Sequence, residues 1–259
     1  MPRTAVRTLP SRAKSGRELA QQWNELNEQI VQCDRCPRLR AYCGEVALAK
    51  RRAYADCDYW GRPVPNFGDP AAGLLIVGLA PAAHGANRTG RMFTGDRSGQ
   101  WLFRALHKAG FATQPASLHR NDDLRLLDCA ITAVCHCAPP DNKPANEELQ
   151  QCRPWLASTL DIVPARVYLA LGQIAWNALA DEARCRGWRV GTRPRFAHGA
   201  KVPLAGGRWL LASYHPSQQN TFTGRLTRRM FDRVFARARR LLDRAAAGAH
   251  GQGGRATPE

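Results

Sequence analysis

The chain has 259 residues, 44% of them hydrophobic, and its 38 lysines and arginines against 21 aspartates and glutamates give a formal net charge of +17. No apolar run approaches the roughly 18 residues that span a membrane, and the basic residues 1–16 lack the apolar core of a secretory signal. We therefore expect a cytosolic globular protein without a membrane segment. The excess of arginine favours a polyanionic partner such as a nucleic acid over a uniformly basic surface with no partner.

The amino-terminal part of the chain contains one clear helical pattern. Residues 1–16 are predicted to form a disordered basic tail, and residues 17–31 an amphipathic helix with an apolar stripe at Leu19, Trp23, Leu26 and Ile30. A Cys-x-x-Cys pair follows, and from there to residue 69 the sequence is irregular and rich in arginine.

An unbroken apolar run at residues 74–79 predicts a strand that is buried on both faces. The loop after this strand is small and polar, and it contains Phe93 and Asp96 among several glycines. Ser98 is predicted to cap the helix that follows the loop.

Further strands are predicted at residues 129–136, 167–171 and 209–214, and further helices after an Asn146 cap, at 173–180 and at 226–246. Strands that alternate with helices indicate a single α/β domain over residues 17–246, with a central, mostly parallel, four-stranded sheet and helices on both faces. Residues 247–259 are rich in glycine and are expected to form a disordered tail.

Polar loops follow three of these strands, and parallel topology places them at one edge of the sheet. The first loop contains Phe93 and Asp96, the second Asn142 and the third His215. An asparagine amide can donate to one ring atom and accept from its neighbour, which matches the O4 and N3–H edge of uracil and mismatches cytosine. An imidazole opposite the amide can donate to O2, where negative charge collects as an N-glycosidic bond breaks.

The nine cysteines are expected to stay reduced in the cytosol, so those with ligand-like spacing are better candidates for metal or cluster ligands than for disulfides. Cys33 and Cys36 form such a pair. The sequence leaves their partners open among Cys129, Cys135, Cys137, Cys152 and Cys185.

Four short motifs occur in order within residues 33–233: Gly78-Leu79-Ala80-Pro81, Phe93-Thr94-Gly95-Asp96, Cys137-x-Pro-Pro-x-Asn142 and His215-Pro216-Ser217. Together with the cysteine pattern they resemble the uracil-DNA glycosylase superfamily, and most closely its iron–sulfur-containing type B branch, also called family 5. The resemblance implies a monofunctional DNA glycosylase that flips uracil out of DNA and hydrolyses the N-glycosidic bond. The product would be an abasic site for base excision repair.

The resemblance also implies roles for individual residues. Phe93 would stack on the extruded base, Asn142 would read it, Gly78 and Ala80 would line the base pocket, and His215 would support the departing base. A [4Fe-4S] cluster is implied on Cys33, Cys36, Cys137 and Cys152. A structural zinc ion on the same residues, and Cys135 in place of Cys137, are the alternatives.

The chain departs from the family pattern where related enzymes have an Asp, Asn or Glu that positions water, because residues 79–82 are Leu, Ala, Pro and Ala. We therefore expect stabilisation of the leaving group by His215 to dominate, with Asp96 as the nearest carboxylate for the water or the sugar cation. The alternative for Asp96 is a helix-entry residue. The small side chains predict a permissive pocket that accepts hypoxanthine and xanthine besides uracil.

Extruding a base from duplex DNA costs roughly a few kcal/mol and leaves a gap, for which Gln219, Phe222 and Leu226 are candidate wedges. Contacts with damaged double- and single-stranded DNA are expected from Arg88, Arg91, Ser217, Gln219 and Arg225, in a monomeric protein. The rival interpretations are a non-catalytic nucleic-acid-binding protein with an iron–sulfur or zinc centre, and a phosphate-handling α/β hydrolase.

Overall fold

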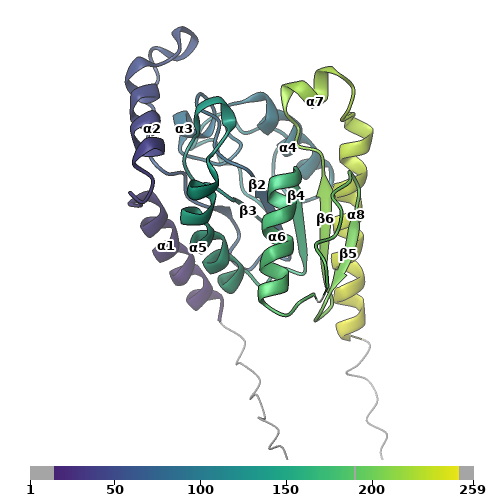
Figure 1. Ribbon diagram of the computed structural model, residues 1–259. Helices are drawn as coiled ribbons and strands as arrows, with labels where there is room; N and C mark the ends of the chain where they lie inside the picture. Colours follow the sequence, from purple (N-terminus) through teal and green to yellow (C-terminus); the bar gives the residue numbers. More distant parts are fainter. Residues whose placement is uncertain (1–14, 190, 251–259) are drawn as a thin grey trace, which may run out of the picture.

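The computed structural model describes residues 15–189 and 191–250. Within these residues, a six-stranded sheet lies between two layers of helices (Figure 1). In spatial order the strands are β1 (Phe67–Gly68), β3 (Cys129–Ala133), β2 (Leu74–Gly78), β4 (Val167–Leu171), β6 (Arg208–Ser213) and β5 (Lys201–Leu204). The four inner strands are parallel, and each edge strand is antiparallel to its neighbour.

The helices connect these strands and cover both faces of the sheet. They are α1 (Gly16–Val31), α2 (Pro37–Ala49), α3 (Ala86–Thr89), α4 (Arg97–Lys108), α5 (Asn146–Ile162), α6 (Gln173–Cys185), α7 (Gln218–Phe222) and α8 (Arg228–His250), with short 3-10 turns η1 (Arg52–Tyr54) and η2 (Pro140–Asn142). In the part of the chain that the structure describes, no helix has the length and apolar character needed to cross a membrane.

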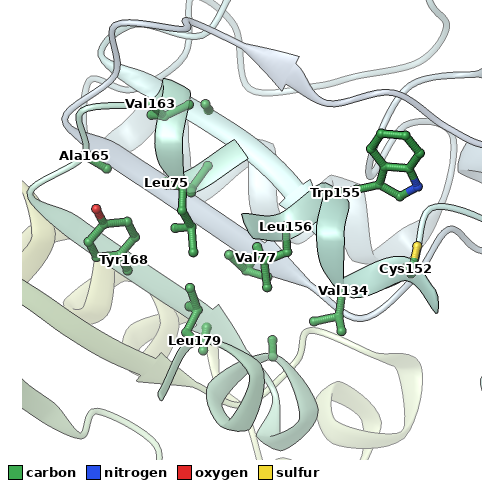
Figure 2. Close-up of a cluster of buried hydrophobic side chains, with 14 of the residues drawn as sticks. Leu75, Val77, Val134, Cys152, Trp155, Leu156, Val163, Ala165, Tyr168 and Leu179 are labelled. Atoms are coloured by element: carbon green, nitrogen blue, oxygen red, sulfur yellow. The ribbon is translucent and has the colours of Figure 1, made fainter. Parts of the chain in front are cut away.

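Alternation along the strands divides the core into two halves. Leu75, Val77 and Tyr168 pack on one face with side chains of α1, α5 and α6, as Figure 2 shows in part. Leu74 and Ile76 point the other way, toward α4 and α8. Because both faces are covered, every residue of β2, β3 and β4 is buried, which explains their unbroken apolar runs.

The prediction of a four-stranded sheet is wrong in the number of strands, although its parallel centre is confirmed. The structure adds the antiparallel edge strands β1 and β5. β1 has only 2 residues, and β5 exposes Lys201 and Pro203, so neither has the apolar pattern that identifies a strand.

Helix starts also differ from the predictions. Asp96, not Ser98, caps α4, and its Oδ1 accepts a hydrogen bond from the Gly99 N–H at 2.7 Å. Asn146 is the first residue of α5 rather than its cap. Helix α2 lies in the stretch that was predicted to be irregular. The sequence pattern did not reveal it, because only Leu39 and Cys43 are buried and the helix has no continuous apolar stripe.

The expected tails fall mostly outside the described residues, which exclude 1–14 and 251–259. At the start of the described part, the Ser15 hydroxyl caps α1 by accepting from the Glu18 N–H. At the other end, α8 continues to His250, so residues 247–250 are helical rather than part of a disordered tail.

Candidate active site

A cavity of about 790 Å³ lies at the carboxyl ends of the parallel strands. Its wall comes from the segments that follow β2, β3, β4 and β6, which topology brings to the same edge of the sheet. The structure therefore brings together Phe93, Asp96, Asn142 and His215, as the loop pattern predicted.

Phe93 is held in a strained backbone conformation on this wall. Its φ is 55°, in the left-handed region that costs a non-glycine residue about 1–3 kcal/mol. A Cβ added to Gly78 would lie 2.9 Å from Phe93 Cζ, so the ring packs directly on the end of β2. The Phe93 and His215 ring centroids are 5.9 Å apart, with 32° between the ring planes. An aromatic face and an imidazole are thus neighbours in the cavity.

Asn142 reaches the cavity from the end of η2. Its φ of 57° belongs to the left-handed region, which asparagine tolerates better than most residues, and its N–H donates to the Pro139 carbonyl at 3.2 Å. The residue is exposed, and no described residue hydrogen-bonds to its side-chain amide. The amide is therefore available to a ligand.

His215 lies two residues after the end of β6, is partly exposed and lines the cavity. Withdrawal from bulk solvent lowers the pKa of His215 to about 4. Its main chain is fixed, because the His215 carbonyl accepts from Asn220 Nδ2 at 2.9 Å. At pH 7 the ring is consequently neutral and offers one N–H donor and one acceptor.

Asp96 is partly buried, and its two carboxylate oxygens have different surroundings. One carboxylate oxygen caps α4, and a Cβ at position 85 would collide with the other, so Gly85 leaves room for Oδ2. Desolvation raises the pKa of Asp96, while the Gly99 and Ser98 N–H groups and the Arg88 charge act in the opposite direction. The helix-entry alternative is confirmed as a cap, and the same carboxylate also lines the cavity.

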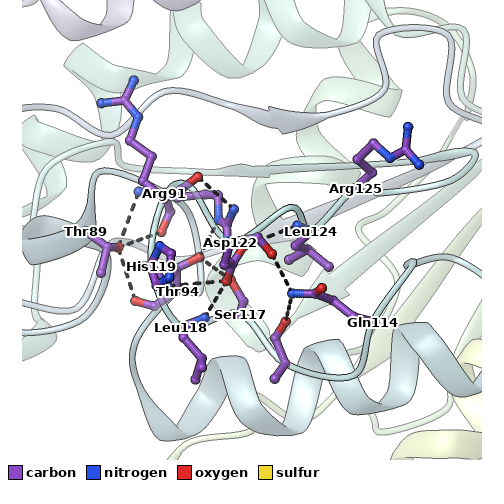
Figure 3. A network of polar contacts seen from close by, with 12 residues as sticks. Thr89, Arg91, Thr94, Gln114, Ser117, Leu118, His119, Asp122, Leu124 and Arg125 are labelled. Atoms are coloured by element: carbon purple, nitrogen blue, oxygen red, sulfur yellow. Dashed lines mark hydrogen bonds and ion pairs between the residues drawn. The ribbon is translucent and has the colours of Figure 1, made fainter.

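Burial of Arg91 argues against its predicted role as a DNA contact. The residue is only 6% exposed, and its guanidinium donates to Asp122 and Ser117 at 2.6 Å and to Thr94 at 2.9 Å (Figure 3). It ties the Phe93 loop to the segment around Asp122. Its guanidinium also donates to the Arg120 carbonyl at 3.1 Å, so all three of its nitrogens have partners within the protein.

Arg88 is also committed to this loop, where it donates to the carbonyls of His84 and Gly95 and stacks on Tyr54. Ser217 lines the cavity and caps α7 by accepting from the Asn220 N–H at 3.3 Å. Gln219 is exposed and lines the cavity, and Arg225 is exposed with its guanidinium 4.7 Å from the centre of the Tyr214 ring.

Burial excludes one of the three wedge candidates and leaves Gln219 and Phe222, which are both exposed. Leu226 is fully buried and packs in the core, so it cannot enter DNA. Phe222 is 65% exposed on α7, with the Arg97 guanidinium 4.1 Å from the centre of its ring. Arg97 itself lines the cavity, so the two side chains stand at its rim.

Sequence reasoning missed the segment after β4. Gly172, Gln173 and Ile174 line the cavity, and Gly172 has a φ of 101° where the chain turns from β4 into α6. The signal was a glycine between a buried strand and a helix, which is typical of a ligand-facing turn in open α/β sheets.

A second, narrow cavity gathers five cysteines, namely Cys33, Cys36, Cys135, Cys137 and Cys152. A hydrogen bond with Cys152 and burial raise the pKa of the Cys135 thiol. A hydrogen bond with Cys43 and burial raise the pKa of the Cys137 thiol. Cys135 and Cys137 thus both belong to the cysteine cavity, but they face different partners.

Cysteine thiolates can hold either a structural zinc ion or an iron–sulfur cluster. Among the described residues, no three His, Cys, Asp or Glu side chains converge closely enough to hold one metal ion. A structural zinc needs four ligands around one point. Each thiolate of a [4Fe-4S] cluster binds a different iron, so its ligands stand further apart.

Unpaired buried polar atoms also lie in the cysteine cavity. Within the described residues, two buried N–H donors without a hydrogen-bond partner belong to side chains of the cysteine cavity, Arg40 Nη1 and Trp155 Nε1. The unpaired His136 Nε2 is an acceptor, because Nδ1 donates to the Val64 carbonyl. A buried polar group left unpaired costs about 1–3 kcal/mol. Their concentration here is consistent with a bound group that has its own polar atoms, and the sulfur atoms of a cluster accept hydrogen bonds. The residues present therefore fit an iron–sulfur cluster.

Comparison with known proteins agrees with this geometry. Residues 65–239 match the family described as the Uracil DNA glycosylase superfamily. A Type-5 uracil-DNA glycosylase of Thermus thermophilus is 53% identical over 215 residues, which cover 83% of this chain and 95% of that protein. A Type-5 uracil-DNA glycosylase of Mycobacterium leprae is 52% identical over 219 residues, or 84% and 94% of the two chains. A Type-4 uracil-DNA glycosylase of Pyrobaculum aerophilum is 33% identical over 168 residues, or 64% and 69%. The chain is thus a DNA glycosylase, a hydrolase, and it belongs to the uracil-DNA glycosylase superfamily.

Proposed function

We propose that this enzyme excises uracil from DNA by hydrolysing the N-glycosidic bond, and that it leaves an abasic site for base excision repair. The observation that supports the proposal most directly is the convergence of Phe93, Asn142 and His215 on one cavity at the sheet edge. An aromatic face, a free amide and a neutral imidazole are the groups needed to hold a flat polar base.

Recognition of uracil falls to Phe93 and Asn142. The extruded base stacks on the Phe93 ring, whose position is fixed by its contact with Gly78. The Asn142 amide donates to O4 and accepts from N3–H, a pairing that cytosine cannot make. Ala80 and Gly78 complete the pocket wall with small side chains.

Departure of the base is assisted by His215. The neutral imidazole donates its N–H to O2 as negative charge develops there, and a preorganised donor of this kind is worth about 10²–10³ in rate. A neutral donor needs no proton transfer, so the base leaves as an anion whose charge the hydrogen bond stabilises.

Asp96 is proposed to orient the water and to balance the sugar cation. Its Oδ1 is fixed by the cap hydrogen bond, so Oδ2 is the atom that acts. The raised pKa makes this carboxylate a better proton acceptor than an exposed aspartate. It supplies the function that the side chains of residues 79–82 cannot supply.

The same cavity is proposed to admit larger deaminated bases. Its volume of about 790 Å³ and its small wall residues Ala80 and Ala82 leave space for the bicyclic bases hypoxanthine and xanthine. Release assays on duplexes that each carry one lesion test this directly. Release of uracil alone would contradict the broader range.

Double- and single-stranded DNA are the proposed substrates, bound by a monomer in the bacterial cytoplasm. Phe222 is the proposed wedge, and Ser217, Gln219 and Arg225 are the proposed contacts with the DNA backbone. The Arg88 guanidinium already donates to two loop carbonyls, so only its partly exposed edge is proposed to contact DNA. Phe222 should matter in duplex DNA and not in single strands, where no stacked gap has to be filled.

A [4Fe-4S] cluster is proposed on Cys33, Cys36, Cys137 and Cys152, the set that the family pattern implies. When bound, it would join the turn before α2 to the loop after β3 and to α5. Cys135 is the competing fourth ligand, because its thiol contacts Cys152 in this structure. Iron content of the Cys135→Ala and Cys137→Ala variants decides between them, since only the true ligand variant should lose the cluster.

The activity is tested with DNA that carries one uracil. After incubation with the purified protein, alkaline cleavage should produce a strand break at the uracil position, in single-stranded and duplex DNA. His215→Ala and Asn142→Ala should depress the break while DNA binding is retained. Absence of an abasic product with the wild-type holoenzyme would contradict the proposed function.

A further inference from the structure

Trp155 brings a buried N–H group to the cysteine cavity. The side chain is 8% exposed, and its Nε1 is buried without a partner among the described residues. An indole nitrogen can only donate. Trp155 follows Cys152 by one helical turn of α5, so the two side chains share a face of the helix. Figure 2 shows both at the same edge of the core, with the indole nitrogen turned to the side of the Cys152 sulfur.

Arg40 brings a second donor from the opposite element. It lies on α2 one turn after Cys36, lines the same cavity, and has a buried Nη1 without a partner in the described part of the chain. A guanidinium has five N–H donors and no acceptor. A buried N–H without a partner lowers the stability of the fold, unless a bound group accepts a hydrogen bond from it.

His136 is different and is not included. Its Nδ1 lies 2.7 Å from the Val64 carbonyl oxygen, so Nδ1 carries the proton and donates. In that tautomer Nε2 is an acceptor, so it cannot donate to sulfur.

We propose that Trp155 Nε1–H and Arg40 Nη1–H donate hydrogen bonds to sulfur atoms of the cluster and hold its reduction potential above the value it would have without them. The inference rests on the proposed cluster and goes beyond it by assigning residues that tune it. Reduction adds negative charge to the sulfur atoms, so an N–H···S bond stabilises the reduced form more than the oxidised form. Removing either donor should therefore shift the potential to more negative values.

The first test measures the midpoint potential of the holoenzyme in redox titrations followed by electron paramagnetic resonance. Trp155→Phe keeps the ring and removes the N–H, with Trp209→Phe as the control far from the cavity. The control for Arg40→Leu is Arg35→Leu, which removes an equal charge from the same cavity. Arg35 already has partners in the protein, because it stacks on Trp155 and donates to the Gln151 carbonyl. Trp155→Phe and Arg40→Leu should have more negative potentials than the wild type and both controls.

A second measurement detects the Trp155 hydrogen bond directly in the wild-type protein, and Trp155→Phe serves as its control once its iron content matches that of the wild type. Wild-type holoenzyme labelled with ¹⁵N at the indole nitrogens should show a ¹⁵N hyperfine coupling in the reduced cluster, and Trp155→Phe should lack it. Full iron content with unchanged potentials and no ¹⁵N coupling would overturn this proposal and leave the cluster in place. A wild-type protein without a [4Fe-4S] spectrum would overturn both.

Discussion

Replacement of His215 by alanine should slow uracil release by about 10²–10³-fold, which corresponds to about 3–4 kcal/mol of lost transition-state stabilisation. The estimate follows from the loss of one N–H donor aimed at the base from the floor of the cavity. His215→Gln should recover part of the rate, because a glutamine amide still donates. His107→Ala, which alters an exposed histidine on α4, is the control.

The pH dependence separates a neutral donor from a proton donor. With a pKa of about 4 for His215, roughly one imidazole in a thousand is charged at pH 7. A neutral donor gives a rate that does not change between about pH 5 and 8, whereas an imidazolium acid would lose about tenfold per pH unit across that range.

The same pKa has a consequence for stability. The folded pKa lies below the unfolded value of about 6.5, so the unfolded chain binds the proton more tightly. Stability attributable to neutral His215 is complete above about pH 6.5 and is lost as the pH falls toward 4. His215→Gln should be less sensitive to acid in this window.

The assay is single-turnover release from a duplex with one uracil, with enzyme in excess, at each pH from 5 to 8. Binding is measured separately on DNA with a non-cleavable uracil nucleotide. A wild-type rate in His215→Ala, or a steady tenfold fall per pH unit in the wild type, would refute a neutral His215 donor.

Three further outcomes follow from packing and burial. Gly78→Ala should reduce uracil release at least about tenfold, because its Cβ would lie 2.9 Å from the Phe93 ring, whereas Gly44→Ala on α2 has open space and should leave the rate unchanged. Arg91→Met should lower the free energy of unfolding by about 3–5 kcal/mol in urea titrations, since the side chains of Arg91 and Asp122 are each 7% exposed and the carboxylate would be left unpaired; a loss below 1 kcal/mol would contradict this account. Phe222→Ala should slow release from duplex DNA while release from single strands stays near the wild-type rate, and equal losses on both substrates would argue against a wedge.

Local sequence patterns were sufficient for the centre of the fold. The run at β2 is apolar without interruption because helices cover both faces of the strand, and such runs identify buried parallel strands. The edge strand β5 has no such signal, since its residues gain hydrogen bonds to β6 while Lys201 and Pro203 stay exposed.

The site residues that follow parallel strands could be predicted from the sequence. Phe93, Asn142 and His215 follow three parallel strands, and the carboxyl ends of parallel strands meet at one edge whatever the details of packing. Arg91 and Leu226 show the limit of that reasoning. Both stand in polar or basic segments, and only their burial reveals that Arg91 pairs with Asp122 and that Leu226 belongs to the core.

The sequence by itself therefore determined the parallel α/β centre, the polar loops at its edge and the supply of cysteines, because each depends on spacing along the chain. Tertiary structure alone decided which arginines are free, which hydrophobic side chain can reach DNA, and which thiols share a cavity with the unpaired nitrogens of Trp155 and Arg40. These properties depend on distances between segments far apart in the chain, and no local pattern specifies such distances.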